Sequence, residues 1–161
     1  MSQKRILMID DDPSFLEICS AILTEYGCAV DTAKNTADGL EKLVRQRPDL
    51  LILDVMMAAM DEGISFATSL KQREGLGRIP IMIISARPDS EKGYKWTIDQ
   101  DVGWLAAEIF MEKPVMPQDL PHNVSLLLAK ARSPAGWRYQ VSQSFGNGGI
   151  SHPLFGKPPI A

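Results

Sequence analysis

The chain has 161 residues, which is enough for one well-buried core and too few for two ordinary domains. Its composition is 45% hydrophobic and 23% charged with a formal net charge of -3, which is typical of a soluble globular protein and excludes a general attraction to nucleic acid or to anionic membranes. The N-terminus has neither a secretory signal nor an apolar stretch long enough to span a membrane, so we expect a cytoplasmic protein.

The first half of the chain alternates apolar strands with amphipathic helices. The segments 6–9 and 50–53 are continuously apolar, as in a parallel sheet covered on both faces, whereas 29–32 alternates with polar residues and predicts an edge strand. Asp12 can cap the first helix, which Gly27 can end in the left-handed conformation. Pro13 suits the first turn of the first helix, and Pro48 must end the second. The apolar face expected for the first helix is Phe15, Ile18, Cys19, Ile22, Leu23 and Tyr26, and that expected for the second is Ala37, Leu40, Leu43 and Val44.

The second half continues the alternation. Segment 81–84 is a continuously apolar strand and 109–111 is a weaker one. Segment 89–107 should contain a helix, although its apolar residues do not fall on one stripe. The apolar faces expected for the third and last helices are Ile64, Ala67 and Leu70, then Leu120, Val124, Leu127, Leu128 and Ala131.

Strands and helices that alternate over residues 4–132 predict a doubly wound, five-stranded parallel sheet with helices on both faces. We therefore expect one α/β domain at 1–132. Residues 133–161 are rich in Pro and Gly and predict a tail with no independent domain. Its aromatic residues suggest that the tail docks on this domain or on a partner, such as a second copy of the chain.

Charged and polar residues follow the predicted strands. Asp10 and Asp11 come after the first strand, Asp54 after the third, Ser85 after the fourth and Lys113 after the fifth. Since the carboxyl ends of parallel strands meet at one edge, these side chains should converge there. Two carboxylates ~4 Å apart repel by about 4 kcal/mol at an effective dielectric of ~20, so either the pKa of one of them rises sharply or a cation lies among them. Oxygen ligands without His or Cys favour Mg²⁺.

Simpler interpretations account for these residues only one at a time. Helix capping explains Asp12 before Pro13 but leaves a second and third carboxylate unexplained. Asp54 alone could be a turn residue, and Ser85 alone could cap a helix. The occurrence of Asp54, Ser85 and Lys113 together at one edge of the sheet favours a site for phosphoryl transfer onto a carboxylate.

Four segments resemble the signature strands of receiver domains from two-component response regulators, the CheY-like family. The resemblance covers residues 4–132 in the family's order, and it implies a flavodoxin-like receiver fold. The segments are ILMIDDDP at 6–13, PDLLILDVMM at 48–57, PIMIISA at 80–86 and FMEKP at 110–114.

The resemblance implies a role for each matching residue. Asp54 would become an aspartyl phosphate, while Asp10, Asp11, Asp54 and the backbone carbonyl of Met56 would hold Mg²⁺. Lys113 would pair first with Asp54 and then with the phosphoryl group.

The resemblance also implies a switch. Ser85 would hydrogen-bond the phosphoryl group and draw its loop inward, and Phe110 would change between exposed and buried rotamers, although an aromatic residue in a strand is also an ordinary core residue. The bond between Lys113 and Pro114 would be cis. The output face would comprise the fourth helix, the fifth strand and the last helix.

Two departures from the family pattern bear on this switch. The chain has AAMDEG at 58–63 where relatives have PGMDG, and losing the proline should change the conformation and stiffness of that loop. The span from Ser85 to Lys113 is longer than expected by more than one helical turn. Both changes motivate an alternative function, a receiver-fold interaction module that does not switch.

We expect a stand-alone receiver that takes its phosphoryl group from a sensor histidine kinase or phosphotransfer protein. It would catalyse its own Mg²⁺-dependent phosphorylation and its own slow dephosphorylation, and would signal by contact with a downstream protein rather than with nucleic acid or a membrane. A phosphatase with an aspartate nucleophile is a third possibility, but Met56 stands where such enzymes have a second acid. Cys19 and Cys28 are predicted to be small buried thiols, and His122 and His152 to be surface residues.

Overall fold

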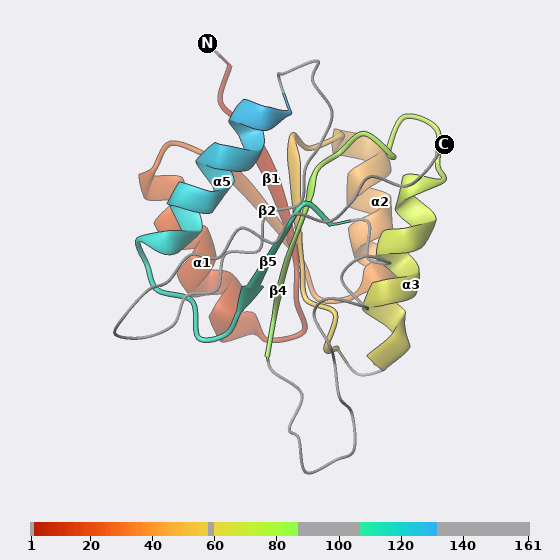
Figure 1. Cartoon of the computed structure of the whole chain (residues 1–161), viewed down its shortest axis with the longest axis horizontal. Coiled ribbons are helices and arrows are strands. Elements are labelled where there is room, and N and C mark those ends of the chain that lie inside the picture. Colours follow the sequence, from red (N-terminus) through yellow and green to blue (C-terminus); the bar gives the residue numbers. More distant parts are fainter. Residues whose placement is uncertain (1, 58–59, 87–106, 132–161) are drawn as a thin grey trace, which may run out of the picture.

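A computed structural model describes residues 2–57, 60–86 and 107–131 of the chain. Five parallel strands form one sheet in the order β2-β1-β3-β4-β5 (Figure 1). This topology confirms the predicted fold class. The helix expected within 89–107, the tail at 133–161 and His152 lie outside the described residues. The strands are β1 (Arg5–Ile9), β2 (Ala29–Ala33), β3 (Leu50–Leu53), β4 (Ile81–Ser85) and β5 (Ile109–Glu112).

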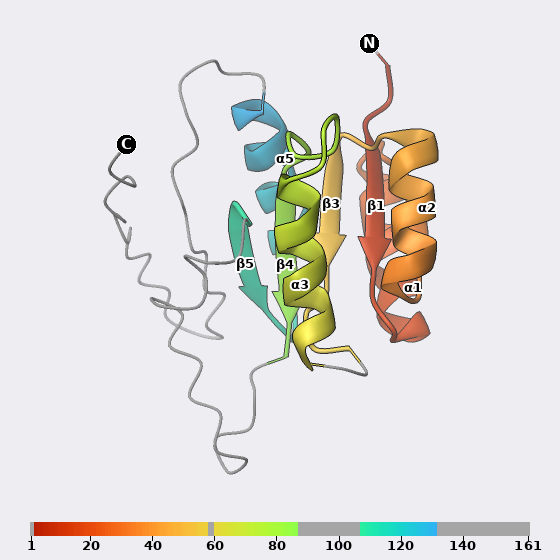
Figure 2. The ribbon, with the colours of Figure 1, turned by 90° about the vertical axis from the view of Figure 1, so that its right-hand side faces the viewer.

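Helices cover both faces of the sheet. Figures 1 and 2 show α1 and α5 on one face and α2 and α3 on the other. These elements are α1 (Pro13–Glu25), α2 (Thr36–Gln46), α3 (Met60–Lys71) and α5 (Asp119–Lys130). None of the helices in the described part of the chain is both long and apolar enough to cross a lipid bilayer.

Two cores lie on the two faces of the sheet, and β1 contributes to both. Ile6 and Met8 belong to the core beneath α1 and α5, whereas Leu7 and Ile9 belong to the core beneath α2 and α3. Successive side chains of a strand point to opposite faces, so a strand buried on both sides must be apolar at every position. This explains why the central strands are continuous apolar runs and why β2, at the edge, is only partly buried.

The ends of α1 and α2 follow the predicted signals. Asp12 caps α1, because its side chain accepts hydrogen bonds from the backbone N–H groups of Ser14 and Phe15. Gly27 follows α1 with φ +85°, a conformation that glycine adopts without a steric penalty. Arg47 ends α2 in the left-handed region, directly before Pro48.

Several predictions of helix faces were wrong. Ile18, Tyr26 and Val44 are 60%, 65% and 57% exposed, and Ala37 and Ala131 are exposed as well. The buried stripe of α1 is Leu16, Cys19 and Leu23. Ile18 lies two residues from Leu16, which is about 200° around a helix and therefore on the opposite side. Apolar residues surround α1 on most sides, so the pattern alone did not select the buried stripe.

Gly63 allows α3 to start close to the end of β3. A Cβ atom at this position would lie 2.5 Å from Val55 Cα and 3.0 Å from the backbone oxygen of Asp54. No side chain fits at such distances, so only glycine lets the helix approach β3 this closely. Residues 60–63 of the altered segment, which was expected to be a loop, thus belong to α3, and the segment retains a glycine where the backbone beside Asp54 requires one.

Burial was predicted for both cysteines and is confirmed for one of them. Cys19 is buried and Cys28 is half-buried, and neither takes part in a disulfide. Burial raises the pKa of Cys19 to about 11 and also raises that of Cys28. Both therefore remain protonated at neutral pH. His122 lies on the exposed side of α5, as expected.

Candidate functional site

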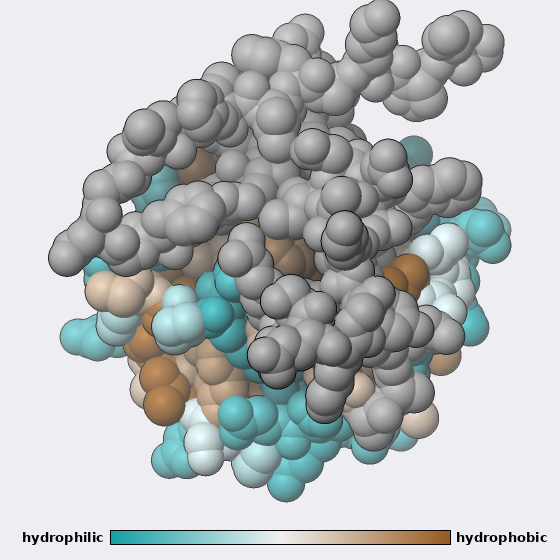
Figure 3. Space-filling model, turned by 60° about the horizontal axis from the view of Figure 1, so that its bottom comes forward, coloured by the Kyte–Doolittle hydropathy of each residue, from teal (hydrophilic) through white to brown (hydrophobic). Residues whose placement is uncertain are grey.

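The residues predicted to carry chemistry meet at the carboxyl edge of the sheet. Figure 2 shows β1, β3, β4 and β5 side by side, with their carboxyl ends at the same edge. Asp10 follows β1, Asp54 follows β3, Ser85 ends β4 and Lys113 follows β5. Figure 3 looks toward this end of the molecule, where the described surface mixes hydrophilic residues with hydrophobic patches.

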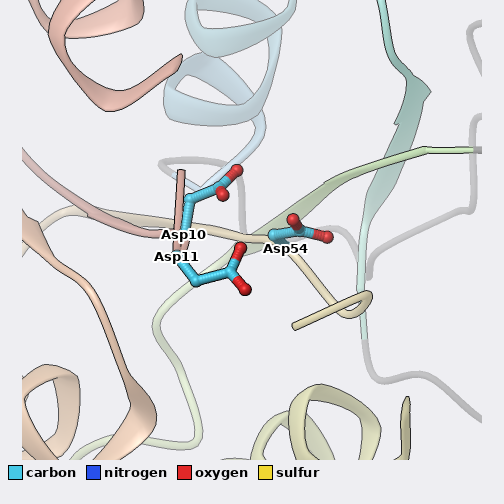
Figure 4. Close-up of side chains that lie close together, drawn as sticks. All are labelled: Asp10, Asp11 and Asp54. Atoms are coloured by element: carbon cyan, nitrogen blue, oxygen red, sulfur yellow. The ribbon is translucent and has the colours of Figure 1, made fainter. Parts of the chain in front are cut away.

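Three carboxylates form the centre of this site. Asp10, Asp11 and Asp54 each offer one oxygen atom, and these oxygens lie within 4.8 Å of one another. Figure 4 shows the three side chains lying close together. Asp10 and Asp54 are only 2% and 4% exposed, whereas Asp11 is open to solvent. Buried carboxylates at this separation repel one another strongly, so positive charge must offset them.

Lys113 supplies part of that positive charge. Its Nζ atom donates to Asp10 Oδ2 at 2.7 Å and to Asp54 Oδ2 at 3.1 Å. The same atom lies 4.2 Å from the centre of the Phe15 ring, in the geometry of a cation–π contact. Phe15 was predicted only as part of the apolar face of the first helix, so this contact with the site was not predicted.

Two further donors hold the Asp54 carboxylate. Its Oδ1 atom accepts from the backbone N–H of Met56 at 2.8 Å and from the Ser85 hydroxyl at 3.0 Å. Together with Lys113, these donors fix both oxygens of Asp54 from three segments of the chain. The role of the Met56 carbonyl as a metal ligand stays a prediction.

The pKa values reflect the crowding of charges. Burial raises the pKa of Asp10, and the charge of Asp54 adds to that rise, although hydrogen bonds from Lys113 and from the Asp12 N–H oppose it. Burial lowers the pKa of Lys113, but its hydrogen bond to Asp10 and the charge of Asp54 outweigh burial and raise it overall. Three carboxylates against one ammonium leave an excess of negative charge. A small divalent cation bound by oxygen ligands fits this excess.

Phe110 lies outside the carboxylate cluster. It is half-buried on β5, pairs with Ile83 of β4 and packs against the core beneath α2 and α3. Its role as a switch stays a prediction. The peptide bond between Lys113 and Pro114 is cis, as the resemblance implied.

A network at the opposite end of β5 was not foreseen. The carboxylate of Glu108 accepts hydrogen bonds from the Lys71 ammonium of α3 and from the backbone N–H of Ile81 in β4. Glu108 also donates its own backbone N–H to the Ile81 oxygen at 2.9 Å. These bonds join α3, β4 and β5, and so fix the strand that leads to Lys113.

Comparisons with known sequences agree with this geometry. The profile of the response regulator receiver domain matches residues 6–125. The alkaline phosphatase synthesis transcriptional regulatory protein PhoP of Bacillus subtilis is 30% identical over 129 residues, which are 80% of this chain and 50% of PhoP. The transcriptional regulatory protein AfsQ1 of Streptomyces coelicolor is 32% identical over 126 residues, covering 78% of this chain and 51% of AfsQ1. The chain thus spans about half the length of the curated relatives it matches.

Solved structures show the same likeness. A putative response regulator from Chloroflexus aurantiacus has a TM-score of 0.68 at 26% identity, covering 80% of this chain and 99% of its own. The chemotaxis response regulator CheY4 of Vibrio cholerae has a TM-score of 0.66 at 25% identity, covering 78% of this chain and 99% of its own.

Proposed function

Because this chain belongs to the response regulator receiver family of two-component systems, we propose that it accepts a phosphoryl group on Asp54. The observation that carries the proposal is the state of the Asp54 carboxylate. Asp54 is 4% exposed, and hydrogen-bond donors hold both oxygens of its carboxylate. Asp10 and Asp11 offer carboxylate oxygens within 4.8 Å of it, and the Lys113 ammonium is in contact with it. A carboxylate fixed in this way is oriented before a phosphoryl donor arrives, which lowers the cost of reaching the transition state.

Asp10, Asp11, Asp54 and the backbone carbonyl of Met56 would hold Mg²⁺ in this proposal. The donor set fits the ion, because it consists of oxygens only and carries more negative charge than Lys113 offsets. When bound, Mg²⁺ would neutralise charge on the transferring phosphoryl oxygens.

The transfer itself would use three side chains. An oxygen of Asp54 attacks the phosphorus of a phosphohistidine; the P–O bond forms as the P–N bond breaks, and the imidazole keeps the electron pair and takes up a proton. The Lys113 ammonium would pair with a phosphoryl oxygen, and the Ser85 hydroxyl, now 3.0 Å from Asp54, would donate to another. Attack by water on the aspartyl phosphate would later reverse the modification slowly.

The phosphodonor would be a sensor histidine kinase or a phosphotransfer protein in the cytoplasm. Phosphorylation adds charge and acceptor oxygens beside Ser85, which would draw its loop inward and change the packing of Phe110. A downstream protein, or a second copy of the chain, would then recognise the changed surface. The chain spans only about half the length of its curated relatives, so their output partners are not carried over to it. A protein partner is proposed here from the receiver family alone.

Labelling by a small-molecule phosphodonor tests the proposal. Intact-mass measurement after incubation with acetyl phosphate and Mg²⁺ should show one added phosphoryl group in the wild-type chain and none in Asp54→Asn. Asp38→Asn is a matched control, because Asp38 lies in the first turn of α2 and outside the carboxylate cluster. Undiminished labelling of Asp54→Asn would exclude the assignment. A wild-type chain that neither accepts phosphate nor binds millimolar Mg²⁺ would favour the module that does not switch.

A further inference from the structure

Phe15 presents the face of its ring to the ammonium of Lys113. The distance from Nζ to the ring centre is 4.2 Å, well inside the range of about 6 Å over which a ring attracts a cation. The Lys113 side chain is only 19% exposed, so water screens this attraction weakly. The contact is therefore more than the casual proximity of two surface residues.

Local structure holds the ring in this place. Phe15 lies in the first turn of α1, and its backbone N–H donates to the capping side chain of Asp12 at 3.3 Å. The ring is half-buried and packs against the core beneath α1 and α5. The cap that starts the helix thus also sets the position of the aromatic face beside the site.

From this contact we infer that Phe15 is a positioning residue for the phosphoryl-transfer reaction, acting through Lys113. The inference rests on the proposed function of Asp54. Phe15 touches neither the phosphoryl donor nor the carboxylate that receives it; its ring keeps the Lys113 ammonium next to Asp54 until phosphoryl oxygens arrive.

The need for such a residue follows from the two tasks of Asp10. Asp10 accepts the shortest hydrogen bond of Lys113, at 2.7 Å, and it is also one of the three carboxylates that could hold a cation. A carboxylate that binds a divalent cation attracts an ammonium less, and the cation itself repels the ammonium. An aromatic face attracts an ammonium without a net charge, so it does not compete for the metal. The Phe15 contact therefore persists when the pairing with Asp10 weakens.

A packing role for Phe15 makes a different prediction from a cation–π role. Leucine keeps an apolar side chain but removes the ring, whereas tyrosine keeps the ring. Progressive fluorination of the Phe15 ring keeps its shape almost unchanged and withdraws electrons from its face. A packing role depends on shape, and the cation–π role depends on the charge distribution of the ring.

The experiment measures the rate constant of phosphorylation by acetyl phosphate at saturating Mg²⁺. We expect Phe15→Leu to slow labelling by roughly fivefold, Phe15→Tyr to stay near wild type, and mono-, di- and trifluorophenylalanine at position 15 to slow it stepwise. The melting temperature should stay constant across the fluorinated series. Ile18→Leu is the matched control, because Ile18 lies on the same helix, is 60% exposed and takes no part in the site.

A second measurement does not depend on phosphorylation. NMR of the full chain should show the Lys113 side-chain protons shifted upfield by the Phe15 ring, both without metal and with Mg²⁺, and Phe15→Leu should remove the shift. Equal labelling rates along the fluorinated series, or no ring-dependent shift once Mg²⁺ is added, would overturn the role of Phe15. A wild-type chain that shows the shift but accepts no phosphate would instead contradict the proposed function, and this role with it.

Discussion

The Lys113 ammonium and the Asp10 carboxylate, 103 positions apart in the chain, form an ion pair of 2.7 Å at the carboxyl edge of the sheet. Their side chains are 19% and 3% exposed. A pair this deeply buried is costly to break, because the partner that remains keeps an uncompensated charge away from water. The stability of the fold and the charge of the site are therefore linked through Lys113.

Replacing Lys113 should destabilise the protein in a way that Mg²⁺ corrects. Lys113→Met leaves Asp10 without its cation and is expected to lower the free energy of unfolding by about 3 kcal/mol in the presence of a chelator. Millimolar Mg²⁺ should restore part of this loss, because the ion can then neutralise the carboxylates without repulsion from the ammonium. Urea unfolding with chelator and with Mg²⁺ measures both effects.

Lys4→Met is the control for that experiment. Lys4 pairs with Asp49 at 3.6 Å, and both side chains are about 40% exposed. An exposed pair of this kind contributes little, so we expect a change below about 0.5 kcal/mol. A loss in Lys113→Met that is the same in chelator and in Mg²⁺ would argue against a metal site at these aspartates.

Gly63→Ala should destabilise the protein and also disturb Asp54, the proposed phosphoryl acceptor. The new methyl group would lie 2.5 Å from Val55 Cα, so α3 or the end of β3 must move. Forcing one extra carbon into a packed contact costs about 1–3 kcal/mol. Ser65→Ala is the control, since Ser65 is exposed on the same helix. Urea unfolding measures the stability, and acetyl phosphate labelling reports the state of Asp54; an unchanged stability would mean that the helix approaches β3 less closely than described.

The carboxylate site could be predicted from the sequence because it depends on a simple rule of topology. Continuous apolar runs marked the central strands, and the residue that follows each strand must lie at the same edge. Asp10, Asp54, Ser85 and Lys113 were all found in this way, and the structure brings them together.

Contacts between side chains of distant elements could not be predicted in the same way. The position of Phe15 over Lys113 depends on where the first turn of α1 lies relative to the residue that follows β5, and no local pattern encodes that packing. The same holds for Ile18, which was placed in the core although Leu16 takes that position. In a helix with apolar residues on most sides, tertiary packing decides which of them is buried.

Asp31 should make the stability of the protein depend on acidic pH. Burial raises its pKa, but hydrogen bonds from Gln46 and Lys42 outweigh burial and hold the pKa below the ordinary value of 3.8. A carboxyl group whose pKa is lower in the folded state stabilises the fold above the pKa of the unfolded state. This contribution is lost as the pH falls through the lower, folded pKa.

Asp31→Asn should therefore be less stable than wild type at neutral pH, and the difference should shrink below pH 3.8. Urea unfolding of both proteins at neutral and acidic pH measures the difference. The effect at neutral pH should be modest, because the Asp31 side chain is 35% exposed and solvent screens its pairing. Glu41→Gln, in an exposed pair with Arg45, is the control for removing a surface carboxylate and should change the stability little; a difference between Asp31→Asn and wild type that grows in acid would reverse the expected sign.

Glu108→Gln should loosen the pairing of β4 and β5. The Glu108 side chain is 12% exposed and accepts from two donors, the Lys71 ammonium and the Ile81 N–H. The amide of glutamine has one oxygen, so it can serve one donor well, and its NH₂ group would face the other. One buried donor is then left without an acceptor, which costs about 1–3 kcal/mol.

The consequence should reach the site, because β4 ends in Ser85 and β5 leads to Lys113. Hydrogen exchange of the backbone amides in β4 and β5 should become faster in Glu108→Gln. The effect should be clearest at Ile81, because the amide oxygen pairs with the charged Lys71 ammonium and leaves the Ile81 N–H without an acceptor. Glu74→Gln, at an exposed position between α3 and β4, should leave these rates unchanged. If exchange at Ile81 is as slow in Glu108→Gln as in wild type, the strand pairing alone fixes β5, and Glu108 has no influence on Lys113.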